Sequence, residues 1–122
     1  MDERQEGRHG DWLTMPCPFK GGPAYWVSFC AGGKLRAELY IDFEDASTVS
    51  TLYDFLLVRK DDIETAFGGA LSWEELLSRR PCRIADYSNG DVVEVNEHDT
   101  YGGWFLDVLG LLHDALRSPG AE

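Results

Sequence analysis

Two neighbouring segments of the chain alternate apolar and polar residues. Within residues 24–30, the alternate sets are Tyr25, Val27, Phe29 and Trp26, Ser28, Cys30. Within residues 35–43, the apolar positions are Leu35, Ala37, Leu39, Ile41 and Phe43. An alternation with period two predicts strands with one buried face and one wetter face. Because the link at residues 31–34 is short and contains Gly32-Gly33, we predict a β-hairpin.

The spacing of apolar residues then changes to that of a helix. Apolar residues recur mostly three or four positions apart, at Val49, Leu52, Tyr53, Leu56, Ile63 and Phe67. Asp45 or Ser47 can cap the start, and Gly68-Gly69 can end the segment. We therefore predict one amphipathic helix over residues 46–67.

The second half of the sequence follows a similar plan. Residues 71–77 predict one helical turn around Trp73, and Pro81 introduces a predicted strand at residues 82–87. The Asn89-Gly90 pair predicts a tight turn, followed by a returning strand at residues 91–95. A second amphipathic helix is predicted to end near Arg117, with apolar positions Tyr101, Trp104, Phe105, Val108, Leu112, Ala115 and Leu116.

These elements predict an α+β fold in the order β-β-α-β-β-α. Short links between strands favour an antiparallel sheet, with the two amphipathic helices packed on one face. We expect residues 1–11 to form a disordered, polar tail, residues 12–117 a single domain, and residues 118–122 a C-terminal tail.

Composition narrows the class of protein. A sequence of 122 residues with 43% hydrophobic residues is long enough for one domain with a core. No apolar run approaches the ~20 residues of a membrane span, and the polar N-terminus lacks the apolar core of a signal peptide. The three cysteines, Cys17, Cys30 and Cys82, are widely spaced and are interpreted as free thiols. We expect a cytoplasmic protein that does not cross a membrane.

The charge argues against direct nucleic-acid binding. The sequence has 22 acidic and 11 basic residues, a net charge of -11. Nucleic-acid binding requires clustered lysines and arginines, which displace counterions from phosphate. The acidic residues are dispersed, which favours a role in solubility over mimicry of a phosphate backbone.

Motifs that would hold a metal, a cofactor or a nucleophile are absent from the sequence. No lysine follows an acidic residue at the acid-x-Lys spacing of a Mg²⁺-dependent nuclease. Closely paired Cys or His zinc ligands and phosphate-binding glycine loops are also missing, and His113 is interpreted as a surface or helix-end residue. We therefore assign no catalytic residue, metal or cofactor, although nucleophile partners such as those of Cys82 or Ser28 meet only in space.

The sequence also predicts one group of polar residues on the surface of the sheet. If Ile84 points into the core beside Leu39, side-chain parity places six polar residues on the outer sheet face: Arg36, Glu38, Tyr40, Asp42, Arg83 and Tyr87. They would form either cross-strand ion pairs of ~0.2–1 kcal/mol each or a binding surface, because Tyr and Arg are enriched at recognition hot spots.

Several of these segments resemble a known prokaryotic family. Residues 35–42, 63–68, 71–74 and 82–85 are similar, in order, to a bacterial and archaeal domain of unknown function. That family is found alone or C-terminal to nuclease-like, restriction-endonuclease-type domains. The resemblance implies an accessory domain with a link to restriction or defence, and it supplies no catalytic residues. Asp86 departs from the pattern, since a larger apolar residue is expected there.

The sequence therefore supports a non-enzymatic accessory or binding domain that contacts a protein partner through the outer sheet face. Two alternatives stay open: a hydrolase whose site assembles only in space, and an acidic inhibitor that mimics DNA. Converging His, Cys and carboxylate groups in a cleft would favour the hydrolase. Evenly spaced surface carboxylates would favour the mimic.

Overall fold

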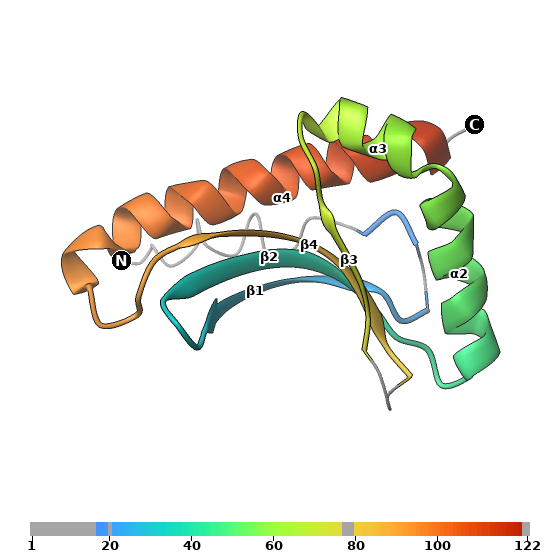
Figure 1. The fold of residues 1–122 in the computed structure, drawn as a ribbon, viewed down its shortest axis with the longest axis horizontal. Helices are drawn as coiled ribbons and strands as arrows, with labels where there is room; N and C mark the ends of the chain where they lie inside the picture. Colours follow the sequence, from blue (N-terminus) through green and yellow to red (C-terminus); the bar gives the residue numbers. More distant parts are fainter. Residues whose placement is uncertain (1–16, 20, 77–79, 121–122) are drawn as a thin grey trace.

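The computed structural model describes residues 17–19, 21–76 and 80–120. Its elements, in order, are β1 (Ala24–Cys30), β2 (Lys34–Ile41), α2 (Ala46–Val58), α3 (Lys60–Phe67), β3 (Ser72–Glu75), β4 (Cys82–Asn89), the short 3-10 helix η1 (Val95–Glu97) and α4 (His98–Gly120) (Figure 1). The predicted tail at residues 1–11 and the start of the predicted domain lie outside the described residues.

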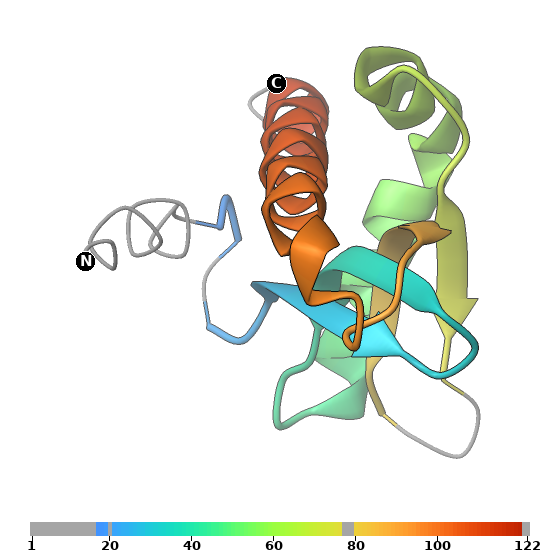
Figure 2. The ribbon, with the colours of Figure 1, turned by 90° about the vertical axis from the view of Figure 1, so that its left-hand side faces the viewer.

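Within this part of the protein, the strands form one antiparallel sheet in the order β1-β2-β4-β3. Helices α3 and α4 lie side by side above it, and α2 lies at its end (Figures 1 and 2). The predicted α+β fold with helices packed on one face is confirmed, and the described residues form three α-helices where two were expected. None of the described helices has the length and apolar character that a membrane crossing requires.

The hairpin of β1 and β2 forms as predicted. Tyr25 pairs with Leu39 and Val27 with Ala37, so the apolar rows of both strands share one face. The turn depends on Gly32 and Gly33, whose φ angles are 83° and 71°. Side chains disfavour this left-handed region, which explains the glycine pair.

The predicted single helix over residues 46–67 is wrong, because it breaks at Arg59 into α2 and α3. Four consecutive charged residues, at positions 59–62, interrupt the apolar stripe between Leu56 and Ile63. At the break, the Arg59 amide bonds to the Leu56 carbonyl at 2.9 Å, one residue closer than in an α-helix. The bend lets buried residues of both helices reach the same core.

Both predicted ends of this helical region are found. The Asp45 carboxylate accepts hydrogen bonds from the Ser47 amide and the Thr48 hydroxyl, as an N-cap does. Gly68 ends α3 at a φ of 100°, and its amide donates to the Glu64 carbonyl.

The predicted helical turn around Trp73 is also wrong, because residues 72–75 form the edge strand β3 beside β4. The Glu64 carboxylate of α3 accepts hydrogen bonds from the Leu71 amide at 2.9 Å and from Trp73 Nε1 at 3.0 Å. These bonds hold the segment extended, with Trp73 packed against Tyr53. A four-residue strand is too short for its alternation to outweigh a helical interpretation.

The predicted returning strand at residues 91–95 does not form. The backbone makes a turn and the 3-10 helix η1, and α4 begins at His98 and continues to Gly120, beyond the predicted end at Arg117. Instead of starting a hairpin, Gly90 donates its amide to the Gly33 carbonyl at 2.9 Å. Val93 is 75% exposed, so this apolar segment covers no sheet face.

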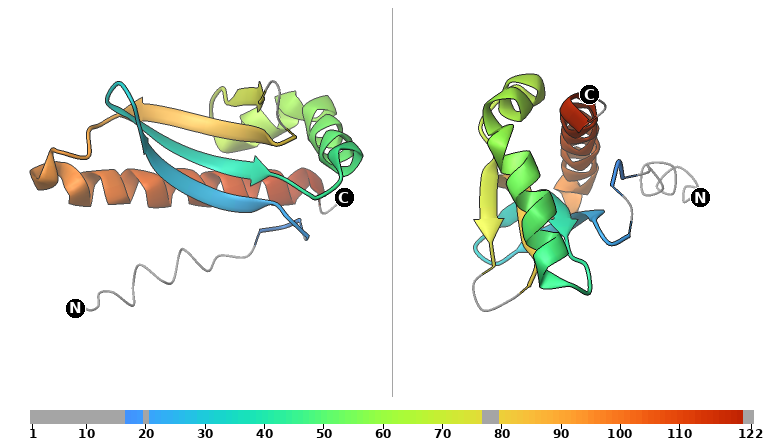
Figure 3. Two further views of the ribbon diagram at one scale, coloured as in Figure 1. Left: turned by 90° about the horizontal axis from the view of Figure 1, so that it is seen from below. Right: turned by 90° about the vertical axis from the view of Figure 1, so that its right-hand side faces the viewer.

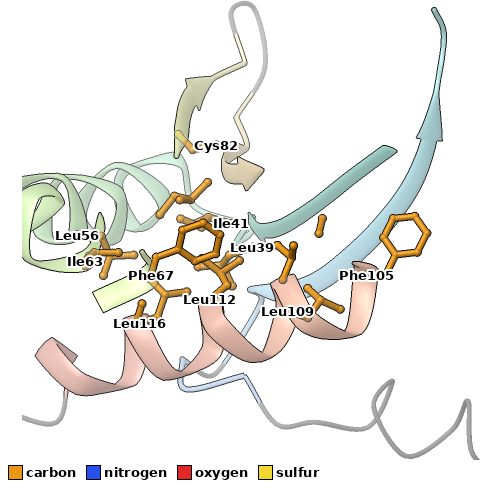
Figure 4. Packing of buried hydrophobic residues seen from close by; sticks show 14 of the residues in the cluster. Leu39, Ile41, Leu56, Ile63, Phe67, Cys82, Phe105, Leu109, Leu112 and Leu116 are labelled. Carbon is orange, nitrogen blue, oxygen red and sulfur yellow. The ribbon is translucent and has the colours of Figure 1, made fainter. Parts of the chain in front are cut away.

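The core lies between the inner face of the sheet and the three helices. Helix α4 runs above β2 and directs Leu109, Leu112 and Leu116 towards the sheet and α3 (Figure 4). Leu39 and Ile41 of β2 face them from the sheet side of the core, and all five side chains are buried. The stripe predicted for the last helix faces the core, except that Trp104 is only half-buried, and Leu109 belongs to the stripe although it was not predicted.

Asp86 is the carboxylate of β4 on this inner face, opposite the buried Ala37. Its side chain is half-buried where an apolar residue was expected. Burial raises the pKa of the Asp86 carboxyl, and a backbone hydrogen bond at Tyr87 opposes this in part.

We expect Asp86→Asn to stabilise the domain at neutral pH. A raised folded-state pKa favours the protonated acid, so wild-type stability falls as the pH rises above the ordinary value of 3.8. Asparagine keeps the shape and an acceptor oxygen but has no charge to desolvate. Urea denaturation should give the variant a higher midpoint at neutral pH and a smaller advantage at about pH 3. An advantage independent of pH would contradict this explanation.

Candidate functional site

The residues of the candidate site share the outer face of the sheet, because side chains alternate between the two faces along each strand. Ile84 pairs with Leu39, and both are buried on the inner face. The pairs Tyr40 with Arg83 and Arg36 with Tyr87 lie one and three positions from this pair along the strands, so their side chains lie on the opposite, outer face. The left panel of Figure 3 looks onto this face, where β1, β2 and β4 lie in front of α4.

A pocket of about 270 Å³ opens on the outer face. Its lining residues are Trp26, Ser28, Arg36, Glu38, Tyr40 and Arg83. Four of them belong to the six residues predicted for the outer face, while Trp26 and Ser28 come from β1 and were not predicted. The register could have identified these two, because Trp26 pairs with Glu38 and Ser28 with Arg36.

Glu38 lines the pocket, but the sequence did not indicate that its side chain is buried. Its side chain is only 3% exposed, whereas a solvated surface pair was one of the two expectations. Arg36 Nε donates to Glu38 Oε2 at 2.8 Å, and Arg83 Nε lies 3.5 Å from Oε1. One carboxylate thus lies between two guanidinium groups with little contact with water.

This cluster leaves two buried polar atoms without a hydrogen bond, Glu38 Oε1 and Arg83 Nε. Arg83 Nε is shared between Glu38 at 3.5 Å and Glu74 at 3.4 Å, too far for a good hydrogen bond to either. Buried polar atoms are usually paired, and unpaired ones mark strain or a missing partner group.

Glu74 of β3 joins the edge strand to the cluster. Its Oε2 atom accepts hydrogen bonds from the Ser72 hydroxyl at 2.8 Å and from the Tyr87 hydroxyl at 2.6 Å. Burial raises the pKa of the Tyr87 phenol, and the bond to Glu74 raises it further. Burial lowers the pKa of Arg36, but its interactions, led by Glu38, outweigh this and raise it overall. Both groups therefore keep their protons at neutral pH.

Two aromatic rings form one wall of the pocket. Trp26 and Tyr40 meet edge to face, with ring centroids 6.1 Å apart and planes at 70°. Trp26 is 54% exposed, so its indole is presented to solvent beside the two arginines.

Asp42 and Tyr87 do not line the pocket. Asp42 follows the last residue of β2, where strand parity no longer applies, and forms an ion pair with Arg80, with Nη2 and Oδ2 3.0 Å apart. The hydrogen bond from Arg80 is the main reason that the pKa of Asp42 is lowered. Asp42 therefore belongs to a separate ion pair.

A second group of polar side chains meets between β1 and α4. His113 was expected at the surface or a helix end, but it is half-buried and its Nδ1 lies 2.9 Å from the Tyr25 hydroxyl. Burial raises the pKa of the Tyr25 phenol and of the nearby Cys17 thiol. Both groups therefore stay protonated at neutral pH, which does not suit Cys17 as a nucleophile.

The other candidate nucleophiles lie apart from this group. Cys82 is buried, and burial raises its pKa. Ser28 lines the pocket, where its hydroxyl lies 3.5 Å from Arg36 Nη2. Among the described residues, no three His, Cys, Asp or Glu side chains are grouped as a metal site.

Comparison with known proteins identifies a family but no characterised relative. A family model described as a domain of unknown function (DUF4268) matches residues 2–118. No curated protein and no solved structure matches the sequence.

Proposed function

Because the chain belongs to the DUF4268 family of domains of unknown function, we propose a function from the geometry of the outer sheet face. The protein is a non-enzymatic accessory domain that binds a protein partner through the pocket centred on Glu38. Its partner belongs to a restriction, defence or nuclease system, as the resemblance noted from the sequence suggests. It acts in the cytoplasm and does not bind nucleic acid directly.

The observation that carries this proposal is the composition of the pocket. Trp, Tyr and Arg are the side chains most enriched at protein–protein hot spots, and all three types line it. An indole that is 54% exposed beside two arginines gains much by burial against a partner. The ion pairs with Glu38 and Glu74 hold the arginines in place, which reduces the entropy lost on binding.

The test is partner capture from the native cell with two matched variants. Trp26→Ala removes the aromatic wall of the pocket, while Phe55→Ala removes an exposed aromatic side chain of α2. Truncating a hot-spot residue costs ~2 kcal/mol or more, so Trp26→Ala should weaken the specific partner by about thirtyfold. Phe55→Ala should retain the partner, and melting curves should show that both variants fold.

Equal capture by both variants would place the binding surface elsewhere. Failure of the wild type to capture any saturable partner would also count against the proposal. In either case, the cross-strand ion pairs would serve only the stability and solubility of the sheet.

A further inference from the structure

We infer that the connection between β4 and α4 is a second interaction surface, which binds a basic segment of a protein partner. We call residues 91–99, which include η1 and the first two residues of α4, the valine loop. It lies at the end of the sheet beside the turn between β1 and β2 (Figure 1). The valine loop shares no residue with the outer-face pocket, so the inference does not depend on the proposed function.

Three valines of this loop present apolar surface to solvent. Val92, Val93 and Val95 are all exposed, Val93 by 75%. Phe29, which is also exposed, adjoins them through His98. The ring centroid of His98 lies 5.9 Å from that of Phe29, and its Nε2 lies 2.7 Å from the Val92 carbonyl oxygen. Single exposed apolar side chains are common, whereas a group of neighbouring ones indicates an interaction site.

Hydrogen bonds hold the valine loop in one shape. The Tyr101 hydroxyl accepts from the Asp91 amide at 3.3 Å and donates to the Glu94 carboxylate. The Asp91 carboxylate in turn accepts from the Val93 amide at 3.2 Å. Along the backbone, the amides of Glu94 and Glu97 donate to the carbonyls of Asp91 and Glu94, each at 2.9 Å. A loop that is already fixed loses little entropy on binding, so its exposed valines form a prepared contact surface.

Charge specifies the chemistry of the partner. Residues 84–116 contain seven acidic residues and neither lysine nor arginine. The start of α4 offsets part of the charge of Asp99, and Lys34 at the adjacent turn donates to Asn89 at 3.0 Å. Within the described part of the chain, none of the loop carboxylates forms a salt bridge. Four exposed carboxylates thus lie among the valines: Asp91, Glu94, Glu97 and Asp99.

A basic protein segment with apolar residues complements this surface best. Its lysines or arginines would meet the carboxylates, and its apolar side chains would cover the valines. Nucleic acid and anionic lipid are repelled by the same carboxylates. A second copy of the protein would place identical acidic loops against each other, in a molecule whose net charge is -11.

Selection from a phage-displayed library of short random peptides tests the inference. The wild-type protein should enrich peptides that carry Lys or Arg beside aliphatic or aromatic residues. A synthetic copy of an enriched peptide, with its N-terminus acetylated, should bind Val93→Ser at least about tenfold more weakly than wild type, because an apolar contact is lost. Glu97→Gln should weaken binding by about threefold, and high salt should weaken binding to wild type, because exposed charges are screened.

The protein offers a matched control for each variant. Val58→Ser removes a valine that is 83% exposed at the end of α2, and Glu75→Gln removes an exposed carboxylate of β3. Both should bind the peptide like wild type. Melting curves should show that all four variants fold.

The remaining outcomes would overturn the inference. Enriched peptides without basic residues, no enrichment, or loss of binding on acetylation would contradict the proposed chemistry. Equal binding by Val93→Ser and Val58→Ser, or weaker binding by Trp26→Ala, would place the peptide outside the valine loop. A wild-type dimer in analytical ultracentrifugation that Val93→Ser converts to a monomer would show that the loop binds a second copy instead.

Discussion

Replacing Leu112 by alanine is expected to lower the free energy of unfolding by about 2–5 kcal/mol. Leu112 is 0% exposed and lies on the face of α4 that meets the sheet (Figure 4). The truncation removes apolar contacts and leaves a cavity between rigid elements that cannot collapse to fill it. Urea denaturation followed by tryptophan fluorescence measures the loss.

Leu111→Ala is the matched control, since it makes the same chemical change at the preceding residue of the helix. Leu111 is 47% exposed, and surface substitutions usually change stability by less than ~0.5 kcal/mol. A similar loss in both variants would mean that the helix face is assigned incorrectly. Small domains have a total stability of ~5–15 kcal/mol, so the core variant should unfold well before the control.

The hairpin and the last helix could be predicted because their patterns are long and regular. Strand β2 alternates over its whole length, and its neighbour β1 is joined to it by a turn that requires glycine. Helix α4 carries an apolar stripe over several turns. Apolar residues at this spacing lie on one face only if the segment is helical. Local pattern and tertiary packing agree in both elements, so the prediction from sequence holds.

The missed elements are those whose structure depends on distant residues. Strand β3 is extended because Glu64 of α3 binds the Leu71 amide and the Trp73 indole. Likewise, Gly90 pairs with Gly33 rather than starting a hairpin, and a Cβ atom at Gly90 would lie 2.8 Å from Leu35. Neither contact can be inferred from a short window of sequence.

The sequence predicted which residues of the candidate site share one face of the sheet, but not how deeply their side chains are buried. Parity correctly places Arg36, Glu38, Tyr40 and Arg83 on one face, because each position depends only on strand pairing. Parity does not show that the long arginine side chains fold over Glu38 and remove it from water. The depth of the pocket therefore depends on rotamers, which the sequence alone does not specify.

Glu38→Ala is expected to destabilise the domain by about 3–5 kcal/mol, the usual cost of breaking a buried ion pair from one side. Removing the carboxylate would leave Arg36 and Arg83 facing each other without their shared counter-ion. Glu75→Ala, at an exposed position of β3, removes the same charge and should change stability little. Urea denaturation of both variants at neutral pH measures the difference.

A triple variant, Glu38→Leu with Arg36→Met and Arg83→Met, separates stability from recognition. Apolar replacement of a whole buried ion cluster is often neutral or stabilising, so this protein should recover most of the loss caused by Glu38→Ala. It should nevertheless fail to bind the partner, because both guanidinium groups are gone. If Glu38→Ala costs less than ~1 kcal/mol, water must reach the cluster and the charges are not buried as the structure places them. If the triple variant still binds, the two arginines serve only to neutralise Glu38, and the aromatic wall of Trp26 and Tyr40 accounts for recognition.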